Sequence, residues 1–213
     1  MRPAQLVFLW LHACADALAA RSMEVWLDGR GAAPAAARRK LDASDGLFDR
    51  ALVADGGRDA DGGGDADGGR DADDRCLVAA AESDGVARLT FKDGSVAGGS
   101  CVVAGAEAQG AAVALVGSVA WVHVDARDGQ PMIVAENLLG KADATGTRIA
   151  CSVGAPADVP GLTFALDRGV DALVLDADAS PELCEAALIA KAQRAESAAG
   201  DDDAAAARDA PTG

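Results

Sequence analysis

The sequence predicts an α/β protein, built from repeated βα units around a mainly parallel sheet that is either open or curled into a partial barrel. Two observations predict this class. Short aliphatic runs without strict alternation recur along the chain, which is typical of strands buried on both faces. Segments of helical length separate several of these runs, most clearly residues 181–196 after the run that ends at Leu175. Repeated units of this kind favour a parallel sheet with right-handed crossovers.

The expected elements begin at Glu24 and together define an α/β domain over residues 23–196. The expected strands are 24–27, 51–54, 76–79, 86–91, 101–103, 113–116, 120–124, 148–153 and 171–176, with a strand-like run at 132–134. The expected helices are 32–41, a segment that ends at Gly169, and 181–196. Pro34 near the start of the first helix suits its first turn. Asp93-Gly94 marks a turn between two strands.

The composition limits both the core and the partners. Half of the 213 residues are apolar, but only 3% are aromatic and none is Tyr. The apolar share therefore rests largely on Ala, and we expect a marginally stable core of Val, Leu and Ala. The formal net charge is −15. An acidic chain repels phosphate backbones, so we expect no nucleic-acid partner.

Two segments have low complexity. Three Gly/Asp hexads occupy residues 56–73 and suggest calcium, which would suit a secreted acidic calcium-binding protein. However, an EF-hand needs a distal Glu, and the calcium-binding β-roll repeat has nine residues with an apolar anchor. No apolar residue of the hexads is larger than Ala, so we expect a disordered insert over 55–74. Residues 197–213 are expected to form a disordered acidic tail.

The first 22 residues resemble a targeting segment. Arg2 precedes an apolar run at 6–11, and Ala17-Leu18-Ala19 has the form of a cleavage site. The run is short for a bilayer span, so we expect no membrane anchor in the mature protein. Alternatively, Met23 is the true start and the protein is cytoplasmic.

The five cysteines form no Cys-x-x-Cys pair, and the chain has only two histidines. Because zinc sites need clustered Cys or His ligands, no metal site is expected. Cys76, Cys101 and Cys151 lie in or beside strand-like runs, where buried thiols are a better interpretation than disulfides.

The stretch from Trp121 to Asp176 carries the strongest functional indication. Its order of motifs resembles the N-terminal half of the type II, archaeal-type 3-dehydroquinate synthase, a family with plant and algal homologues. That family has an apolar run leading into Pro-x-Glu-Asn-Leu, then Ile-x-Ala-Ser-Val, then Leu-x-x-Gly-x-Asp-Gly-x-x-Leu. The matching residues here are Glu136, Asn137 and Leu138; Ile149, Ser152 and Val153; and Leu166, Gly169, Asp171 and Leu175. The chain departs from the family at Val134, where the Pro is expected, and lacks the Trp before Glu-Asn.

The resemblance implies an oxidoreductase of aromatic amino acid (shikimate) biosynthesis. Its reaction would be NAD-dependent oxidative deamination and cyclisation of a small-molecule substrate, an amino-deoxy-heptulosonate, to 3-dehydroquinate. Glu136 and Asn137 are then the expected catalytic residues, at the carboxyl end of the strand-like run 132–134. Glu136 would act as acid, base or amine ligand, and Asn137 would donate to an oxyanion. The same pair could instead cap a helix.

NAD is implied by the resemblance alone. No Gly-x-Gly-x-x-Gly follows a strand, and the glycine-rich segment 94–99 lacks the required spacing, so the cofactor-binding residues are unknown. Asp171 fits a turn before a strand, whereas Asp176 and Asp178 stand at a strand end that could face a ligand.

The resemblance covers only the family's N-terminal half, which leaves a second possibility open. The chain could be a catalytically inactive α/β module that pairs with a separate C-terminal half, or it could form a homo-oligomer. A secretory-type signal before such a domain would suit a plastid protein of an alga.

Overall fold

The computed structural model describes residues 23–55, 75–80, 85–127 and 129–208. The targeting-like segment 1–22, the hexads 56–73 and the end of the expected tail, 209–213, lie outside the described residues. What the sequence predicts for them stays a prediction.

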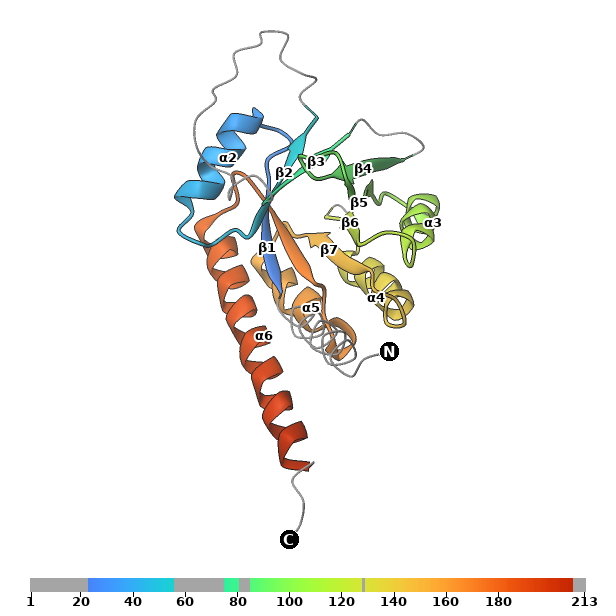
Figure 1. Cartoon of the computed structure of the whole chain (residues 1–213), viewed down its shortest axis with the longest axis vertical. Helices are drawn as coiled ribbons and strands as arrows, with labels where there is room; N and C mark the ends of the chain where they lie inside the picture. Colours follow the sequence, from blue (N-terminus) through green and yellow to red (C-terminus); the bar gives the residue numbers. More distant parts are fainter. Residues whose placement is uncertain (1–22, 56–74, 81–84, 128, 209–213) are drawn as a thin grey trace, which may run out of the picture.

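Eight strands form a closed barrel with helices packed on its outside (Figure 1). The strands are β1 (Glu24–Asp28), β2 (Arg50–Ala54), β3 (Cys76–Ala79), β4 (Val86–Thr90), β5 (Val96–Val102), β6 (Trp121–Asp125), β7 (Arg148–Ser152) and β8 (Ala172–Asp176). The helices are α2 (Pro34–Ala43), α3 (Ala106–Leu115), α4 (Pro131–Ala142), α5 (Val159–Phe164) and α6 (Pro181–Arg208). Two short 3-10 segments, η2 (Pro156–Asp158) and η3 (Ala165–Asp167), flank α5.

Neighbouring strands are parallel except around β4, which pairs antiparallel with both β3 and β5. The barrel closes where β1 pairs with β8, from Glu24 opposite Ala172 to Asp28 opposite Asp176. The predicted α/β class is confirmed, but the predicted open sheet or partial barrel is not, because this last ladder joins the two edges. Closure depends on the register between segments at opposite ends of the domain, which local sequence patterns do not carry.

Two runs that the sequence predicts as strands are helical. Residues 113–116 fall at the end of α3, and 132–134 fall in the first turn of α4. In α4 the buried Val134, Ala135, Leu138 and Leu139 recur with the spacing of one helix face, and Pro131 stands at the start. A short aliphatic run fits a buried strand or a helix equally well, and only the longer period separates them.

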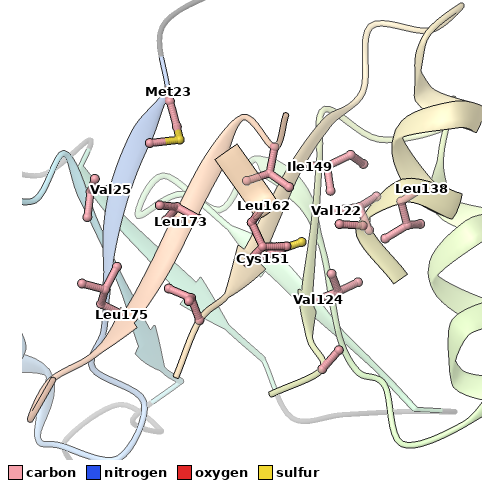
Figure 2. Close-up of a cluster of buried hydrophobic side chains, with 14 of the residues drawn as sticks. Met23, Val25, Val122, Val124, Leu138, Ile149, Cys151, Leu162, Leu173 and Leu175 are labelled. Carbon is pink, nitrogen blue, oxygen red and sulfur yellow. The ribbon is translucent and has the colours of Figure 1, made fainter. Parts of the chain in front are cut away.

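On the strands that helices cover, alternate residues face the helices and form the larger part of the core. On β6 and β8 these outward residues include Val122 and Leu173, which are fully buried. Figure 2 shows part of this layer, with Val122 beside Leu138 of α4 and Leu173 beside Leu162 of α5. Burying each such aliphatic side chain stabilises the fold by roughly 1.5–3 kcal/mol. The parallel strands are therefore held between two apolar layers, as their uninterrupted aliphatic runs predict.

The inward residues fill the barrel and close its lower end, where the parallel strands begin. Trp26 and Trp121 pack with ring centroids 4.6 Å apart at an interplanar angle of 60°. The Glu24 carboxylate accepts hydrogen bonds from the Trp26 indole at 2.6 Å and from Arg50 at 2.8 Å. Arg148 lies 3.6 Å from Glu24 and over the Trp121 ring at 5.2 Å. Large rings and an ionic cluster thus plug this end.

The last helix extends further than the sequence predicts. α6 begins after Ser180, whose hydroxyl accepts from the Leu183 N–H, and continues to Arg208, so 197–208 are helical where a disordered tail is expected. Lys191 of α6 pairs with Asp49 at 2.6 Å, and Asp49 also accepts from the Val25 N–H of β1. In the described part of the chain, no helix combines the length and apolar character that a membrane crossing requires.

Candidate active site

The upper end of the barrel, which we call the mouth, gathers the charged side chains that end the parallel strands. Asp28, Asp125 and Asp176 are the last residues of β1, β6 and β8. Two adjoining cavities of about 370 and 700 Å³ open here and share Val102, Arg127 and Asp176 in their walls. In barrels of parallel strands, the carboxyl-terminal end is where substrates bind, because loops of variable sequence meet there over a rigid base.

The same three-residue unit, Asp-x-Arg, ends β1 and β6 and has the same geometry in both places. Arg30 donates from Nε to Asp28 Oδ1 at 2.9 Å and from Nη2 to Oδ2 at 2.6 Å. Arg127 donates to Asp125 in the same way, at 2.9 and 2.6 Å. The backbone N–H of each Arg also donates to its Asp, at 3.1 and 3.4 Å. Such two-pronged pairing holds each guanidinium in one plane and orientation.

Further contacts join these two units into one charged row across the mouth. Arg30 Nη2 lies 3.9 Å from Asp125 Oδ2, and Arg127 Nη1 donates to Asp176 Oδ2. The row therefore runs from β1 to β6 and on to β8, and two arginines alternate with three aspartates along it.

A buried histidine lies directly below this row. His123 Nδ1 is 2.8 Å from Ser100 Oγ, and Nε2 is 2.9 Å from Ser152 Oγ. A neutral imidazole donates from one nitrogen and accepts at the other, and either tautomer can be matched by rotating the two hydroxyls. Arg30 Nη1 donates to Ser100 Oγ at 3.4 Å, which links the histidine to the mouth. β5, β6 and β7 thus share one polar connection through the barrel interior.

Burial sets the protonation of the site. Burial, and then the charge of Arg30, lowers the pKa of His123 to about 3, so the imidazole is neutral at physiological pH. Burial alone would raise the pKa of Asp28 and of Asp125, but the hydrogen bonds and charge of Arg30 and Arg127 outweigh it and lower both. The hydrogen bond to its aspartate raises the pKa of each Arg. The two Asp-x-Arg units are therefore ionised at physiological pH.

These properties define what the mouth can do chemically. Fixed guanidinium groups suit a carboxylate or another small anion, and ionised aspartates suit hydroxyl or ammonium groups. Asp176 is the most exposed of the three carboxylates in the row and is accessible to a ligand in the cavity. Val102, which is exposed, adds an apolar wall. A small, polar, charged molecule fits this lining best.

Glu136 and Asn137 do not lie at the mouth. Both are in the middle of α4, on the outside of the barrel, where Glu136 is half-buried and Asn137 is exposed. The prediction that they follow a strand is wrong, because α4 is already helical from Pro131. Their alternative role as a helix cap is wrong for the same reason, since the N-cap is Gln130.

The structure separates the other predicted carboxylates by the end of the barrel at which they lie. Asp171 precedes β8 at the lower end, and its carboxylate accepts from the Ile149 N–H at 2.8 Å, which fits its predicted role before a strand. Burial raises the pKa of Asp171. Asp176 and Asp178 both line the larger cavity, as their position after a strand predicts.

Sequence reasoning missed both Asp-x-Arg units and His123. A usable indication existed, because Asp28-Gly29-Arg30 and Asp125-Ala126-Arg127 each follow directly on a buried aliphatic strand. A charged pair repeated at two such strand ends predicts one shared site, since parallel strands end on the same side of the sheet.

The glycine-rich segment 94–99 does not form a loop that fits a dinucleotide phosphate. Gly94 is a turn residue with φ +85°, and Gly98 and Gly99 lie within β5. A Cβ on Gly98 would overlap the Trp121 carbonyl, and one on Gly99 would lie 2.6 Å from Leu115. These glycines therefore allow close packing between elements and do not open a helix that could bind phosphate. Among the described residues, no group of three or more His, Cys, Asp or Glu could hold a metal ion.

No family model, curated protein or solved structure matches the chain.

Proposed function

We propose that the chain is a small-molecule enzyme that works at the mouth of the barrel, and that its reaction is of the 3-dehydroquinate synthase type. The observation that carries the proposal is the charged row of Arg30, Arg127 and three aspartates above the buried His123. A protein without a ligand to bind gains little from holding two arginines and three carboxylates at a cavity rim, since the cost of desolvating partly buried ion pairs offsets much of their attraction.

The substrate class of that reaction suits the lining of the mouth. An amino-deoxy-heptulosonate has a carboxylate, an amine and hydroxyl groups. Arg127 presents N–H donors that suit the carboxylate, and Asp176 on the cavity wall suits the amine. A base near the reacting carbon and a cation near the developing oxyanion are what deamination and ring closure require.

Two of the three motifs of the resemblance also support an active site at the mouth. Ser152, in the second motif, is the last residue of β7 and bonds His123. Leu175, in the third motif, immediately precedes Asp176 at the end of β8. The ungapped part of the resemblance, Arg148 to Leu175, thus covers two neighbouring strands, of which β8 ends at the cavities.

NAD stays a prediction of the resemblance. When bound, it would accept the hydride of the oxidative deamination. The roles proposed for this chain are narrower: Arg127 binds and orients the carboxylate, Asp176 binds the amine, and His123 keeps Ser100 and Ser152 in place.

The test is NADH formation from the amino-sugar substrate by the purified chain. Arg127→Met should abolish activity or raise KM strongly, whereas Glu136→Gln, on the outer helix, should leave kcat/KM within about twofold of wild type. If Glu136→Gln is inactive and Arg127→Met is active, the chemistry belongs to α4 and the proposal fails.

A second candidate has one observation in its favour. Four large apolar side chains are exposed where α4 meets α5 and η3: Met132 and Ile133 of α4, Phe164 at the end of α5, and Leu166 of η3. Exposed apolar groups of this kind mark protein contacts. This favours a non-catalytic module that pairs with a separate half or with a second copy. An inactive wild-type chain that sediments as a dimer, and becomes monomeric on Ile133→Asp, would support it.

A further inference from the structure

Arg127 has two carboxylate partners that differ in how firmly they are held. Asp125 accepts three hydrogen bonds from Arg127, from the backbone N–H, Nε and Nη2. Asp176 accepts one, from Nη1. The Asp125 side chain is 14% exposed and the Asp176 side chain is 45% exposed.

This difference has an energetic meaning. Asp125 is a permanent support that fixes the plane of the guanidinium, because removing it would leave a partly buried charge without its partner. Asp176 makes the kind of half-solvated ion pair that contributes little to stability. A competing carboxylate from solution can therefore displace Asp176 from Arg127 but not Asp125.

The surroundings of Asp176 suit such an exchange. It is the last residue of β8, and the chain continues through Ala177 and Asp178, which also line the larger cavity. Arg127 and Asp176 line both cavities, so their contact lies where the two cavities adjoin. A ligand in either cavity can therefore contact this pair.

We propose that Asp176 takes, in the unliganded protein, the place on Arg127 that the substrate carboxylate takes on binding. The inference rests on the proposed function only in assuming that the mouth binds substrate, and it names the ligand class as a carboxylic acid with neighbouring hydroxyl groups. On displacement, Asp176 stays at the cavity wall, where it accepts a hydrogen bond from the amine or a hydroxyl of the same ligand.

Charge favours a carboxylate over a phosphate in this position. Asp28, Asp125, Asp176 and Asp178 surround only Arg30 and Arg127 at the mouth. A monoanion adds one negative charge to this excess, whereas a phosphate close to its dianionic form adds nearly two. The mouth should therefore discriminate against phosphate and accept a carboxylate.

The experiment is calorimetric titration of D-glycerate and, separately, of inorganic phosphate into the full chain at low ionic strength. Asp176→Ala removes the internal competitor and should tighten D-glycerate binding by about three- to tenfold. Asp178→Ala removes an equal charge from the same cavity wall without touching Arg127, and should tighten it by less than about twofold. Phosphate should bind more weakly than D-glycerate to both variants.

Equal gains from Asp176→Ala and Asp178→Ala would overturn the proposal, because a general charge effect would then explain them. Weaker D-glycerate binding by Asp176→Ala would overturn it too. D-glycerate binding that is still tighter in the Asp176→Ala, Arg127→Lys double variant would also count against the proposal. Lys keeps the positive charge but lacks the planar pair of donors that the proposal requires.

These outcomes are separate from those of the proposed reaction. Tighter D-glycerate binding without NADH formation would support the exchange at Arg127 and reject the synthase activity. NADH formation by the wild-type chain, together with an unchanged D-glycerate affinity in Asp176→Ala, would support the synthase activity and reject the exchange at Arg127.

Discussion

His123 makes the stability of the barrel depend on pH. Burial lowers its pKa from 6.5 to about 3, because a charged imidazole cannot be solvated between the Ser100 and Ser152 hydroxyls and below Arg30. In the unfolded chain the imidazole regains its ordinary pKa. Below that pKa, the imidazole is protonated in the unfolded state but stays neutral in the folded state. The contribution of the neutral imidazole is therefore fully present above the unfolded pKa of 6.5 and is lost progressively as the pH falls toward about 3.

The size of the effect follows from the two pKa values of His123. Each pH unit below the unfolded pKa lowers the free energy of unfolding by about 1.4 kcal/mol, so the loss at about pH 5 is about 2 kcal/mol. That is a large part of the stability of an ordinary domain, about 5–15 kcal/mol. Mild acid alone should therefore destabilise the barrel measurably.

The assay is urea denaturation of wild type and His123→Gln at about pH 7.5 and about pH 5. Gln keeps one donor and one acceptor near Ser100 and Ser152 but does not titrate. Wild type should lose about 2 kcal/mol more than the variant on acidification, since groups common to both cancel in the difference. An equal loss in both proteins would refute the reasoning. A resonance of the His123 imidazole, identified by its absence from the NMR spectrum of His123→Gln, that titrates near pH 6.5 in the folded protein would refute it independently.

Three further outcomes are expected. Gly98→Ala should destabilise the protein by more than about 3 kcal/mol, because the new Cβ overlaps a backbone carbonyl. Gly110→Ala on α3 meets open space and should be neutral or stabilise the protein by up to about 1 kcal/mol. Thermal denaturation of the two variants tests this difference. Glu24→Gln should lower the free energy of unfolding by about 1–2 kcal/mol, because Trp26 and Arg50 lose their charged acceptor at the lower end of the barrel. An unchanged midpoint in urea denaturation would contradict that role. Alkylation of the native protein should label the half-buried Cys184 but not Cys151, because burial raises the pKa of the Cys151 thiol to about 12. Peptide mass spectrometry measures the labelling, and faster labelling of Cys151 than of Cys184 would contradict the prediction.

The strands were predictable where their residues are aliphatic and buried on both faces. β7 and β8 lie within runs that the sequence predicts as strands, and β6 is shifted by one residue from its predicted run 120–124. Parallel strands between two apolar layers need continuous Val, Leu, Ile and Ala, which makes such runs recognisable. β5 was only partly predicted, since Gly98 and Gly99 read as loop residues. Their lack of a side chain is what allows β5 to approach Trp121 and Leu115.

The helices and the site show where local patterns are insufficient. α4 was misread because Met132 to Val134 fits a strand when taken alone, and that error moved Glu136 to a strand end that does not exist. Asp176 was identified as ligand-facing because it directly follows a strong strand. Its partner Arg127 comes from another strand, so the pair depends on barrel closure and could not be derived from either segment separately.

The pairing of β1 with β8 also has a consequence for the newly made chain. Glu24 meets Ala172, 148 positions later in the sequence. At about 5–20 residues per second, synthesis of the intervening chain takes roughly 7–30 seconds. Throughout that interval, one edge of β1 presents unpaired N–H and C=O groups that can pair with another chain. The yield of monomeric protein should therefore fall when translation slows between β1 and β8, and it should recover when nascent chains are kept dilute.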